Sequence, residues 1–227
     1  MTPAHEPYLT AMGSDRLVRF YDVVVRLAMR ERQIRGRVIA RAALAPGGRL
    51  LDLGCGTGTL AILAQRLHPQ ATVVGVDGDP AILGIARGKA ARAGVAVQLD
   101  EGMAYALPYA DGSFDAVTST LMLHHLTQDQ RARALAEVRR VLRPGGRLVV
   151  ADFAPPHNRL MALAGRAART LIRLHGGGPG EHGGHAPARP ERELAALGWR
   201  DVSPPEEHMT LAGTLALVTA TRPDDRP

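Results

Sequence analysis

Short apolar runs and longer amphipathic stretches alternate along the chain from residue 49 onward. The short runs predict buried strands, and the longer stretches repeat their apolar positions every three or four residues, which indicates helices. Strands alternating with helices predict βαβ units and a parallel sheet covered on both faces. We therefore expect an α/β fold with a doubly wound, Rossmann-like sheet. The predicted strands are residues 49–53, 71–76, 95–99, 114–119, 147–153, 199–203 and 210–220.

Capping residues mark the ends of the predicted helices. Asp79 places a side-chain acceptor directly before Pro80, and proline is favoured at the first position of a helix. Gly94 is expected to end this helix in a left-handed conformation. Thr127 and Gln130 have the spacing of a capping box ahead of a further helix.

Two segments lie outside the alternation. Residues 14–45 carry apolar residues at helical spacing with arginines between them, which predicts an amphipathic helical segment. We expect residues 1–45 to form a helical cover or lid on a core of residues 46–222; a helix for a membrane surface or a partner is the alternative. Residues 155–190 are expected to form a substrate-side insertion or lid, because their HGGGPGEHGGHAP stretch lacks core-forming residues. A last helix is predicted near residues 190–197.

The composition is that of an ordinary globular domain. The chain has 227 residues, of which 45% are hydrophobic, so it is long enough to bury a core as one large domain. Cys55 is the single cysteine, which excludes an intramolecular disulfide and points to a reducing compartment. No apolar stretch approaches the roughly 20 residues of a membrane span, and the first residues do not resemble a secretion signal. We therefore expect a cytoplasmic protein without a membrane span.

The net charge of +6 raises the question of a nucleic-acid partner. All but one of the 28 basic residues are arginines, a bias that GC-rich coding also produces, and only 4% of the residues are aromatic. Few side chains are therefore available for stacking on bases. We expect a solvated basic surface, no nucleic-acid partner and a small-molecule substrate; a homodimer is compatible with the sequence.

A glycine-rich turn joins the first predicted strand to the helix that follows it. Residues 50–60 read LLDLGCGTGTL. Glycine allows positive φ angles and lets a ligand approach the backbone closely, and the next helix presents N–H groups at its start. The spacing differs from the GxGxxG dinucleotide motif and from the GxxxxGK[ST] phosphate loop. Asp77 ends the next strand, where a carboxylate can accept both hydroxyls of a ribose. The sequence thus predicts a nucleoside site without a pyrophosphate.

Four stretches of the sequence resemble motifs of the class I S-adenosylmethionine-dependent methyltransferases, in particular the small-molecule branch that includes the quinone-biosynthesis C-methyltransferases. LLDLGCGTG is similar to the first motif of that family and VVGVDGDP to its second-strand acid, while LPYADGSFDAVTSTLMLHHL and LRPGGRLVVADF are similar to its fourth and fifth strands. The resemblance covers about residues 49–153. It implies a seven-stranded, mostly parallel sheet with the last strand antiparallel, and S-adenosyl-L-methionine at the carboxyl ends of the first, second and fourth strands.

The resemblance also implies a set of cofactor-binding residues. Asp52 would orient the aminoacyl group of the cofactor, directly or through water. Asp77 would take the ribose hydroxyls, and the glycines of the loop would lie against the methionine and the ribose. The full set expected at the cofactor is Asp52, Gly54, Cys55, Gly56, Gly58, Asp77, Gly78, Met103, Ala104, Leu121 and Tyr21.

One position departs from the pattern of the family. The family usually has Gly-Asp-Ala ahead of its Leu-Pro, and that aspartate accepts from the adenine amino group; this chain has Gly102-Met103-Ala104. Either Met103 packs on the edge of the adenine while the backbone of Ala104 makes the polar contact, or Asp100 or Glu101 takes over the role.

A histidine pair follows the fourth predicted strand. His124 or His125 is a candidate catalytic base, because imidazole titrates near neutral pH and the pair lies where the family meets its substrate. Packing or a backbone contact is the alternative role, since methyl transfer from a sulfonium depends mainly on alignment. The spacing of His175, His182 and His185 is irregular and the glycines around them offer no support, so we expect no metal site.

The sequence therefore predicts an enzyme that transfers a methyl group from S-adenosyl-L-methionine to the oxygen, nitrogen or carbon of a small, mostly apolar metabolite. One alternative is a non-catalytic binding subunit with the same fold, which the departure at Met103 suggests. The other is a nucleic-acid methyltransferase, which the net charge suggests. Against the latter, the Asp/Asn-Pro-Pro-Tyr/Phe signature of amino-methylating enzymes is absent, because residues 119–122 read STLM.

Overall fold

The computed structural model describes residues 31–154, 189–210 and 213–224. Its strands form one seven-stranded sheet in the order β3-β2-β1-β4-β5-β7-β6. The strands are β1 (Arg49–Leu53), β2 (Thr72–Asp77), β3 (Gln98–Glu101), β4 (Phe114–Thr120), β5 (Leu142–Phe153), β6 (Glu206–Thr210) and β7 (Gly213–Thr221). The helices of the described part are α2 (Glu31–Ala42), α3 (Thr59–Leu67), α4 (Pro80–Ala93), the short 3-10 helix η1 (Leu123–His125), α5 (Gln128–Val141) and α7 (Pro190–Ala196).

The sheet has the predicted mixture of strand directions. β1 pairs in parallel with β2 and with β4, while β3 and β5 extend the parallel sheet on either side. β7 is antiparallel to both β5 and β6. The predicted doubly wound sheet with an antiparallel last strand is therefore confirmed. The chain reverses its direction of progress through the sheet between β1 and β4, and the carboxyl ends of these strands define the crevice in which such sheets bind ligands.

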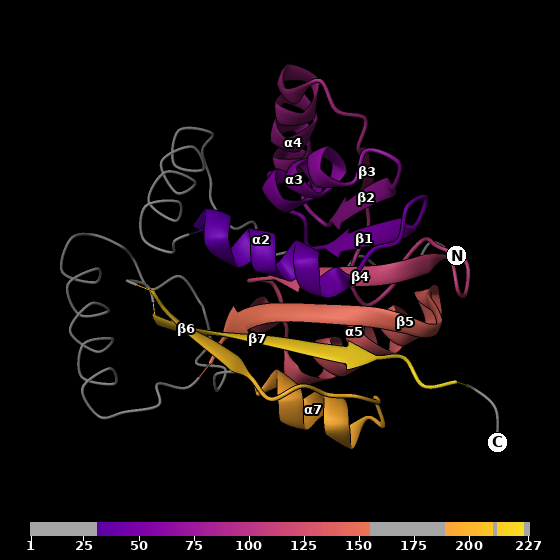
Figure 1. Cartoon of the computed structure of the whole chain (residues 1–227), viewed down its shortest axis with the longest axis vertical. Helices are drawn as coiled ribbons and strands as arrows, with labels where there is room; N and C mark the ends of the chain where they lie inside the picture. The colour runs from indigo at the N-terminus through magenta and orange to yellow at the C-terminus, as the bar shows by residue number, and fades with distance from the viewer. Residues whose placement is uncertain (1–30, 155–188, 211–212, 225–227) are drawn as a thin grey trace, which may run out of the picture.

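Helices cover both faces of the sheet (Figure 1). One face packs against α2 and α3, and its core includes Ile34, Val38 and Leu60. The other face packs against α5 and α7, whose Leu135 and Leu194 are buried in the second core. In Figure 1, α2 crosses in front of β1 and β4, and α5 lies behind β5. The two cores hold the strand ends in fixed positions, so side chains at the carboxyl edge have a rigid support.

The predicted helix caps are also confirmed. Asp79 accepts from the N–H of Ala81 at 2.8 Å, and Gly94 ends α4 with a φ angle of 65°. Thr127 and Gln130 form a capping box at the start of α5. These local signals fix where the helices after β2 and β4 begin.

One of the two strands predicted near the C-terminal end is wrong. Residues 199–203 form no strand and contribute only a bridge between Arg200 and Thr221, whereas the strand predicted at 210–220 is confirmed as β7. Trp199 suggested a strand, but it packs into the core from a loop. β6 reads EEHMT and was missed because an edge strand needs no apolar alternation. The third strand also lies later than predicted, since Gln98 is the first residue of β3 that pairs with β2.

α2 belongs to the segment predicted as an N-terminal helical cover. Its Arg37 and Arg41 form ion pairs with Glu206 of β6, so it also contacts the C-terminal hairpin. The rest of the predicted cover, residues 1–30, lies outside the described residues, as does most of the predicted insertion at 155–190. In the part of the chain that the structure describes, no helix has the length and apolar character needed to cross a membrane.

Candidate cofactor site

The loop after β1 has the backbone that its glycines predict. Gly54, Gly56 and Gly58 have φ angles of 67°, 52° and 73°, which residues with a Cβ rarely adopt. A Cβ at Gly54 would lie 2.2 Å from Cγ of Met122, whereas a Cβ at Gly56 would meet no described atom within 4 Å. The N–H of Gly54 donates to the carbonyl of Val76 at 2.9 Å, which fixes the loop to β2. Gly54 therefore admits the tip of β4, and Gly56 leaves its backbone accessible.

Asp77 connects this loop to the tip of β2. The N–H of Gly56 donates to Oδ2 of Asp77 at 2.8 Å, and the N–H of Asp79 donates to Oδ1 at 3.1 Å. Burial raises the pKa of Asp77, and these two backbone donors oppose the shift. Each oxygen of a carboxylate accepts about two hydrogen bonds, so both oxygens retain room for a donor from a ligand.

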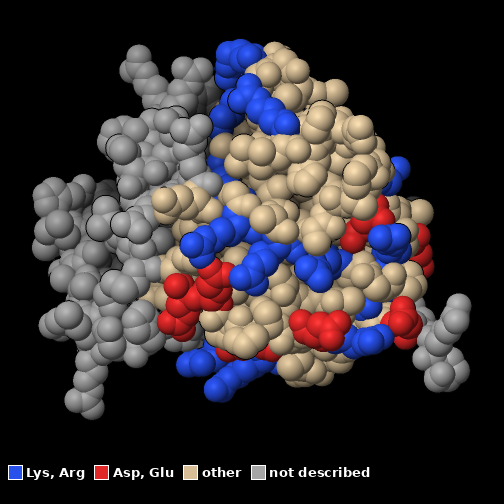
Figure 2. Space-filling view, viewed as in Figure 1, with Lys and Arg blue, Asp and Glu red and all other residues tan. Residues whose placement is uncertain are grey.

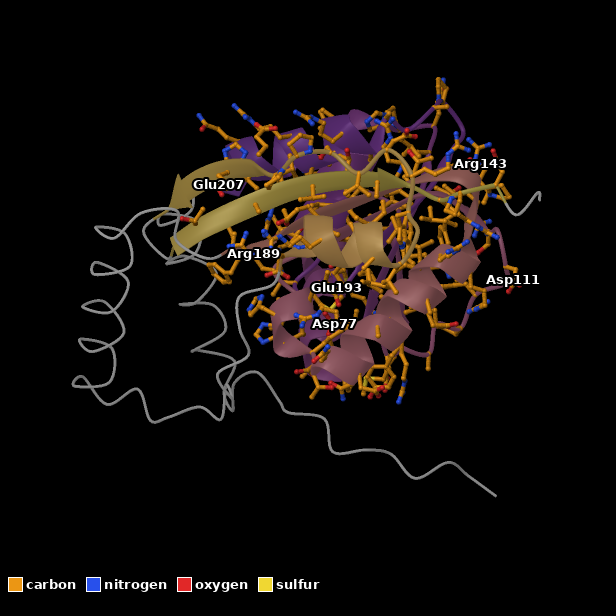
Figure 3. The ribbon with its side chains drawn as sticks, turned by 90° about the horizontal axis from the view of Figure 1, so that it is seen from below. Asp77, Asp111, Arg143, Arg189, Glu193 and Glu207 are labelled. Atoms are coloured by element: carbon orange, nitrogen blue, oxygen red, sulfur yellow. The ribbon has the colours of Figure 1, made fainter. Side chains whose placement is uncertain are left out.

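The surroundings of Asp77 differ from those of two acids near the start of β4. Asp111 and Asp115 form ion pairs with Arg140 and Arg143, at distances of 2.8 Å in both cases. Within the described residues, Asp77 accepts only from backbone N–H groups. Figure 3 shows Asp77 well apart from Asp111 and Arg143. The tip of β2 therefore presents a carboxylate that no basic side chain neutralises.

Lys89, the single lysine of the chain, braces the loop from α4. Its Nζ donates to Oγ1 of Thr57 at 2.7 Å and to Oγ1 of Thr59 at 2.8 Å. The lysine thus holds the second half of the loop and the start of α3 against α4.

Asp52 lies on β1 and is buried, with 2% of its surface exposed. Oδ1 accepts from the hydroxyl of Thr118 at 3.1 Å, while Oδ2 is buried and has no hydrogen-bond partner among the described residues. Burial raises the pKa of Asp52 to about 7, which the hydroxyl of Thr118 and the charge of Arg35 oppose. A buried acceptor without a partner is unfavourable unless a ligand or water supplies a donor.

The tip of β4 closes over the loop. Leu121 has a φ angle of 55°, a left-handed conformation that is strained for a bulky side chain. Its N–H donates to the carbonyl of Ala151 at 2.8 Å, which holds the bend in place. The bend brings Met122 against Gly54 and gives this side of the site an apolar wall.

The turn at residues 102–104, where the sequence differs from the family's Gly-Asp-Ala pattern, lies next to Asp77. The N–H of Gly102 donates to the carbonyl of Asp77 at 3.0 Å, and the N–H of Ala106 donates to that of Met103 at 2.9 Å. Met103 and Ala104 are both half-buried. The two residues that the sequence predicts at an adenine edge therefore lie in a turn that is hydrogen-bonded to Asp77.

The acids offered as replacements at this position have different surroundings. Oδ2 of Asp100 accepts from the hydroxyl of Tyr109 at 3.0 Å and from the amide of Gln98 at 2.7 Å. Glu101 is exposed and stands opposite Asp77 in the register of β2 and β3. The side chain of Asp100 is thus engaged within the fold, and Glu101 lies at the edge.

The two histidines that the sequence left equivalent differ in the structure. Nδ1 of His124 lies 2.7 Å from Oδ1 of Asp152, and the backbone N–H of His124 donates to Oδ2 at 3.2 Å. Asp152 has 0% of its surface exposed, whereas the side chain of His124 is 24% exposed. The ring of His124 lies 4.0 Å from that of His125 and 5.0 Å from that of Phe153, centroid to centroid. A buried carboxylate at the tip of β5 therefore orients His124.

Not every predicted residue reaches this edge by its side chain. The Sγ of Cys55 would lie 2.9 Å from a Cβ at Gly75 of β2, so its side chain packs on the sheet and only its backbone lines the loop. Burial raises the pKa of the Cys55 thiol, which keeps it protonated and inert. Tyr21 lies outside the described residues, as do His175, His182 and His185. Among the described residues no group of three His, Cys, Asp or Glu side chains is arranged to hold a metal.

Asp152, Lys89 and Thr118 lie in the site but were not predicted from the sequence, and the same holds for Met122. Asp152 is the lone acid in the apolar run LVVADF, and a charged residue in a buried strand is a signal that was available. Lys89 could have been noticed because it is the only lysine in the sequence. Thr118 carries no such signal, because threonine is common in strands.

Known proteins are similar to this chain in sequence and in fold. Residues 50–146 match the family model described as a methyltransferase domain. The chain is 48% identical over 108 residues to the demethylmenaquinone methyltransferase of Thermus thermophilus, a match covering 48% of each chain. It is 37% identical over 171 residues to that of Beutenbergia cavernae, covering 74% of this chain and 68% of the relative.

Solved structures with the same fold include a SAM dependent methyltransferase from Aquifex aeolicus and the [4+2]-cyclase SpnF. The first has a TM-score of 0.64 at 18% identity and covers 92% of this chain and 99% of its own. The second has a TM-score of 0.63 at 22% identity and covers 84% of this chain and 81% of its own. At such low identity the two structures support the fold alone.

The chain therefore belongs to the S-adenosylmethionine-dependent methyltransferase family, as the resemblance of its motifs implied. Within that family it is similar in particular to demethylmenaquinone methyltransferases. The chain spans about half the length of the first curated relatives it matches, with 48%, 54% and 57% of their residues covered.

The cofactor of this family is S-adenosyl-L-methionine, and the geometry of the site fits it. The unpaired Oδ2 of Asp52 suits an ammonium group or its water, and the carboxylate of Asp77 suits two ribose hydroxyls. The open backbone at Gly56 leaves space along the loop. Asp77 has no basic side chain as a partner among the described residues, which suits a ligand that carries a sulfonium charge.

Proposed function

We propose that the protein transfers a methyl group from S-adenosyl-L-methionine to a small, mostly apolar acceptor. One observation carries the proposal: the glycine loop and the acid at the tip of β2 are joined by the 2.8 Å hydrogen bond from Gly56 to Asp77. This bond sets the distance between the loop backbone and a ribose-binding carboxylate.

Each part of the cofactor has an assigned group on the chain. Asp77 would accept from the ribose hydroxyls, with Gly78 beside it, and Gly54 and Gly56 would lie along the sugar and the methionine. Asp52 would accept from the ammonium group through its unpaired oxygen. When bound, the cofactor supplies a methyl group on a positively charged sulfur.

The remaining work of the chain is alignment and exclusion of water. Positioning alone can contribute roughly 7 to 11 kcal/mol to such a reaction. Leu121 and Met122 at the tip of β4 provide an apolar wall beside the loop, and the strain at Leu121 indicates a conformation that the fold maintains at some cost.

The acceptor that we propose to test first is a reduced naphthoquinone with a prenyl chain, because the relatives in Thermus thermophilus and Beutenbergia cavernae are demethylmenaquinone methyltransferases. The purified protein would be mixed with methyl-labelled S-adenosyl-L-methionine and prenylated naphthoquinol kept reduced with dithionite. We expect a product heavier by one methylene, detected by mass spectrometry, and S-adenosylhomocysteine in equal amount. Binding of the cofactor without methyl transfer to this quinol or to a panel of phenols would favour a non-catalytic binding subunit.

A small molecule is favoured over a nucleic acid by the charge pattern of the described surface. Figure 2 shows basic side chains in a band over the middle of one face, with acidic side chains directly beside it. Arg37 and Arg41 are paired with Glu206, and Arg143 with Asp115. Retention of DNA or RNA that weakens with rising salt would contradict this part of the proposal. We also propose a cytoplasmic location.

A further inference from the structure

We propose that His124 is the catalytic base of methyl transfer and that Asp152 positions it. This inference rests on the proposed function and adds to it a catalytic residue and a positioning residue. It rests on the 2.7 Å contact between Nδ1 of His124 and Oδ1 of Asp152.

The hydrogen bonds of Asp152 determine which nitrogen of His124 carries the proton. The carboxylate of Asp152 already accepts two backbone N–H groups, from His124 at 3.2 Å and from Phe153 at 2.7 Å. A carboxylate that accepts both of these N–H groups can only accept from Nδ1 as well. The proton of the neutral ring is then on Nδ1, and Nε2 has a lone pair. Nε2 makes no hydrogen bond with any described residue.

The position of His124 agrees with a role toward a substrate. It lies two residues after Met122, whose side chain contacts Gly54 of the glycine loop. The ring is 24% exposed, so a ligand can reach it, while its anchor Asp152 is fully buried in β5. A buried acid that holds one side of an accessible imidazole is the arrangement by which other enzymes fix the tautomer of a histidine base.

Two titratable groups face the ring of His124 within the described residues. Asp152 approaches it from β5, and the ring of His125 lies 4.0 Å away from the same 3-10 helix. Phe153 packs against it edge-on and carries no charge. His125 also makes a contact of its own, but the bond to a buried carboxylate is made by His124.

The proton balance of the step is simple. As the acceptor oxygen bonds to the methyl carbon, it gives its proton to Nε2 of His124, and the carbon–sulfur bond breaks with both electrons left on the now uncharged sulfur. For transfer to a ring carbon, the hydroxyl gives its proton to Nε2 while the ring carbon beside it bonds to the methyl carbon. The proton of that carbon is then lost to solvent, and the oxygen regains a proton, which restores the aromatic hydroxyl. The imidazolium stands against Asp152 and releases its proton to solvent.

The first test reads the tautomer without any turnover. In ¹⁵N NMR spectra of the apo protein, we expect His124 to show a protonated Nδ1 and an unprotonated Nε2 at pH 8. Asp152→Ala removes the acceptor of Nδ1, so the preference for this tautomer should be lost. A protonated Nε2 in the wild-type protein, or a tautomer preference that Asp152→Ala leaves unchanged, would overturn the positioning role.

The second test separates catalysis from structure. With the reduced prenylated naphthoquinol as the probe, His124→Gln should lower kcat by about 100-fold or more while the Kd for the cofactor changes less than threefold. Its rate should also lose the rise with pH that a histidine base gives the wild type. Asp152→Asn should lower kcat by about 10- to 1000-fold. His68→Gln, at the end of α3, serves as the matched histidine control.

The outcomes separate this inference from the proposed function. A His124→Gln variant that keeps its kcat, or a His125→Gln variant that loses as much, overturns the assignment of the base even though methyl transfer itself stands. A wild-type protein that fails to bind S-adenosyl-L-methionine overturns the proposed function, whatever the tautomer of His124. Methylation of a probe with methoxy groups in place of both hydroxyls would show that no hydroxyl proton has to be removed, and would overturn the role of the base.

Discussion

Replacing Asp77 with alanine removes the carboxylate at the tip of β2 that is hydrogen-bonded to the glycine loop. The side chain loses its bonds from Gly56 at 2.8 Å and from Asp79 at 3.1 Å, together with any acceptors for a ribose. We therefore expect weaker binding of the cofactor and a looser loop. The two effects are separable, because only the first needs a ligand.

The expected magnitude follows from the two bonds to a ribose. A hydrogen bond to a charged group contributes about 1.5 to 3 kcal/mol, and two of them would contribute about 3 to 6 kcal/mol in a dry site. Asp77 is half-buried, so solvent reduces this figure by roughly half. The Kd for S-adenosyl-L-methionine should then rise by about 10- to 100-fold.

Titration calorimetry with two ligands distinguishes the ribose bonds from a general charge effect. S-adenosyl-L-methionine and S-adenosylhomocysteine share the ribose, but only the first carries the sulfonium, so Asp77→Ala should weaken both by similar factors. Asp129→Asn removes one negative charge from an 82% exposed side chain at the start of α5 and should leave both affinities nearly unchanged. Thermal melting of the apo variants measures the loss of loop anchoring separately. An unchanged Kd for both ligands in Asp77→Ala would refute the placement of the ribose.

Three further variants test neighbouring parts of the site. Gly54→Ala should lower cofactor affinity more than tenfold and destabilise the fold by about 1 to 3 kcal/mol, because its Cβ would lie 2.2 Å from Met122 at a positive φ angle. Calorimetry measures the affinity and urea unfolding measures the stability. The control Gly84→Ala, which has open space in α4, should be neutral or stabilising. Burial raises the pKa of Asp52 from 3.8 to about 7. The folded protein therefore keeps a proton that the unfolded chain releases, and stability falls as pH rises from about 4 to 7. Asp52→Asn removes this loss, so its stability relative to wild type should grow by up to about 3 kcal/mol between pH 5 and 8 in urea titrations; a constant difference would contradict the shifted pKa. Lys89→Met removes two hydrogen bonds to the glycine loop, and its cofactor affinity should fall by about three- to tenfold with a melting temperature lower by a few degrees; equal affinity would show that the loop needs no brace.

The parallel half of the fold was predictable because each of its signals is local. β1 lies at the residues predicted for it, and the caps at Asp79 and Thr127 mark the helices that follow β2 and β4. The C-terminal hairpin was not predictable in the same way. β6 is stabilised by its pairing with β7 and by ion pairs from α2 to Glu206, and both depend on residues far away in the sequence.

The site likewise has a part that was predictable from local sequence and a part that was not. The glycine loop and Asp77 are set by backbone conformation and by the order of neighbouring strands, both of which a sequence motif records. The contact between His124 and Asp152 spans 28 residues and two strands, and spacing alone does not reveal it. For the same reason the sequence offered no way to choose between His124 and His125.

The position of β7 has a consequence for how the molecule is made. β7 lies between β5 and β6, yet it is the last strand of the chain. During synthesis the ribosome releases β5 some 60 residues before β7, so the growing sheet exposes one long side of β5 until its antiparallel partner emerges. An unpaired strand of this kind readily joins other chains, and nascent copies of the protein are most exposed to aggregation in that interval.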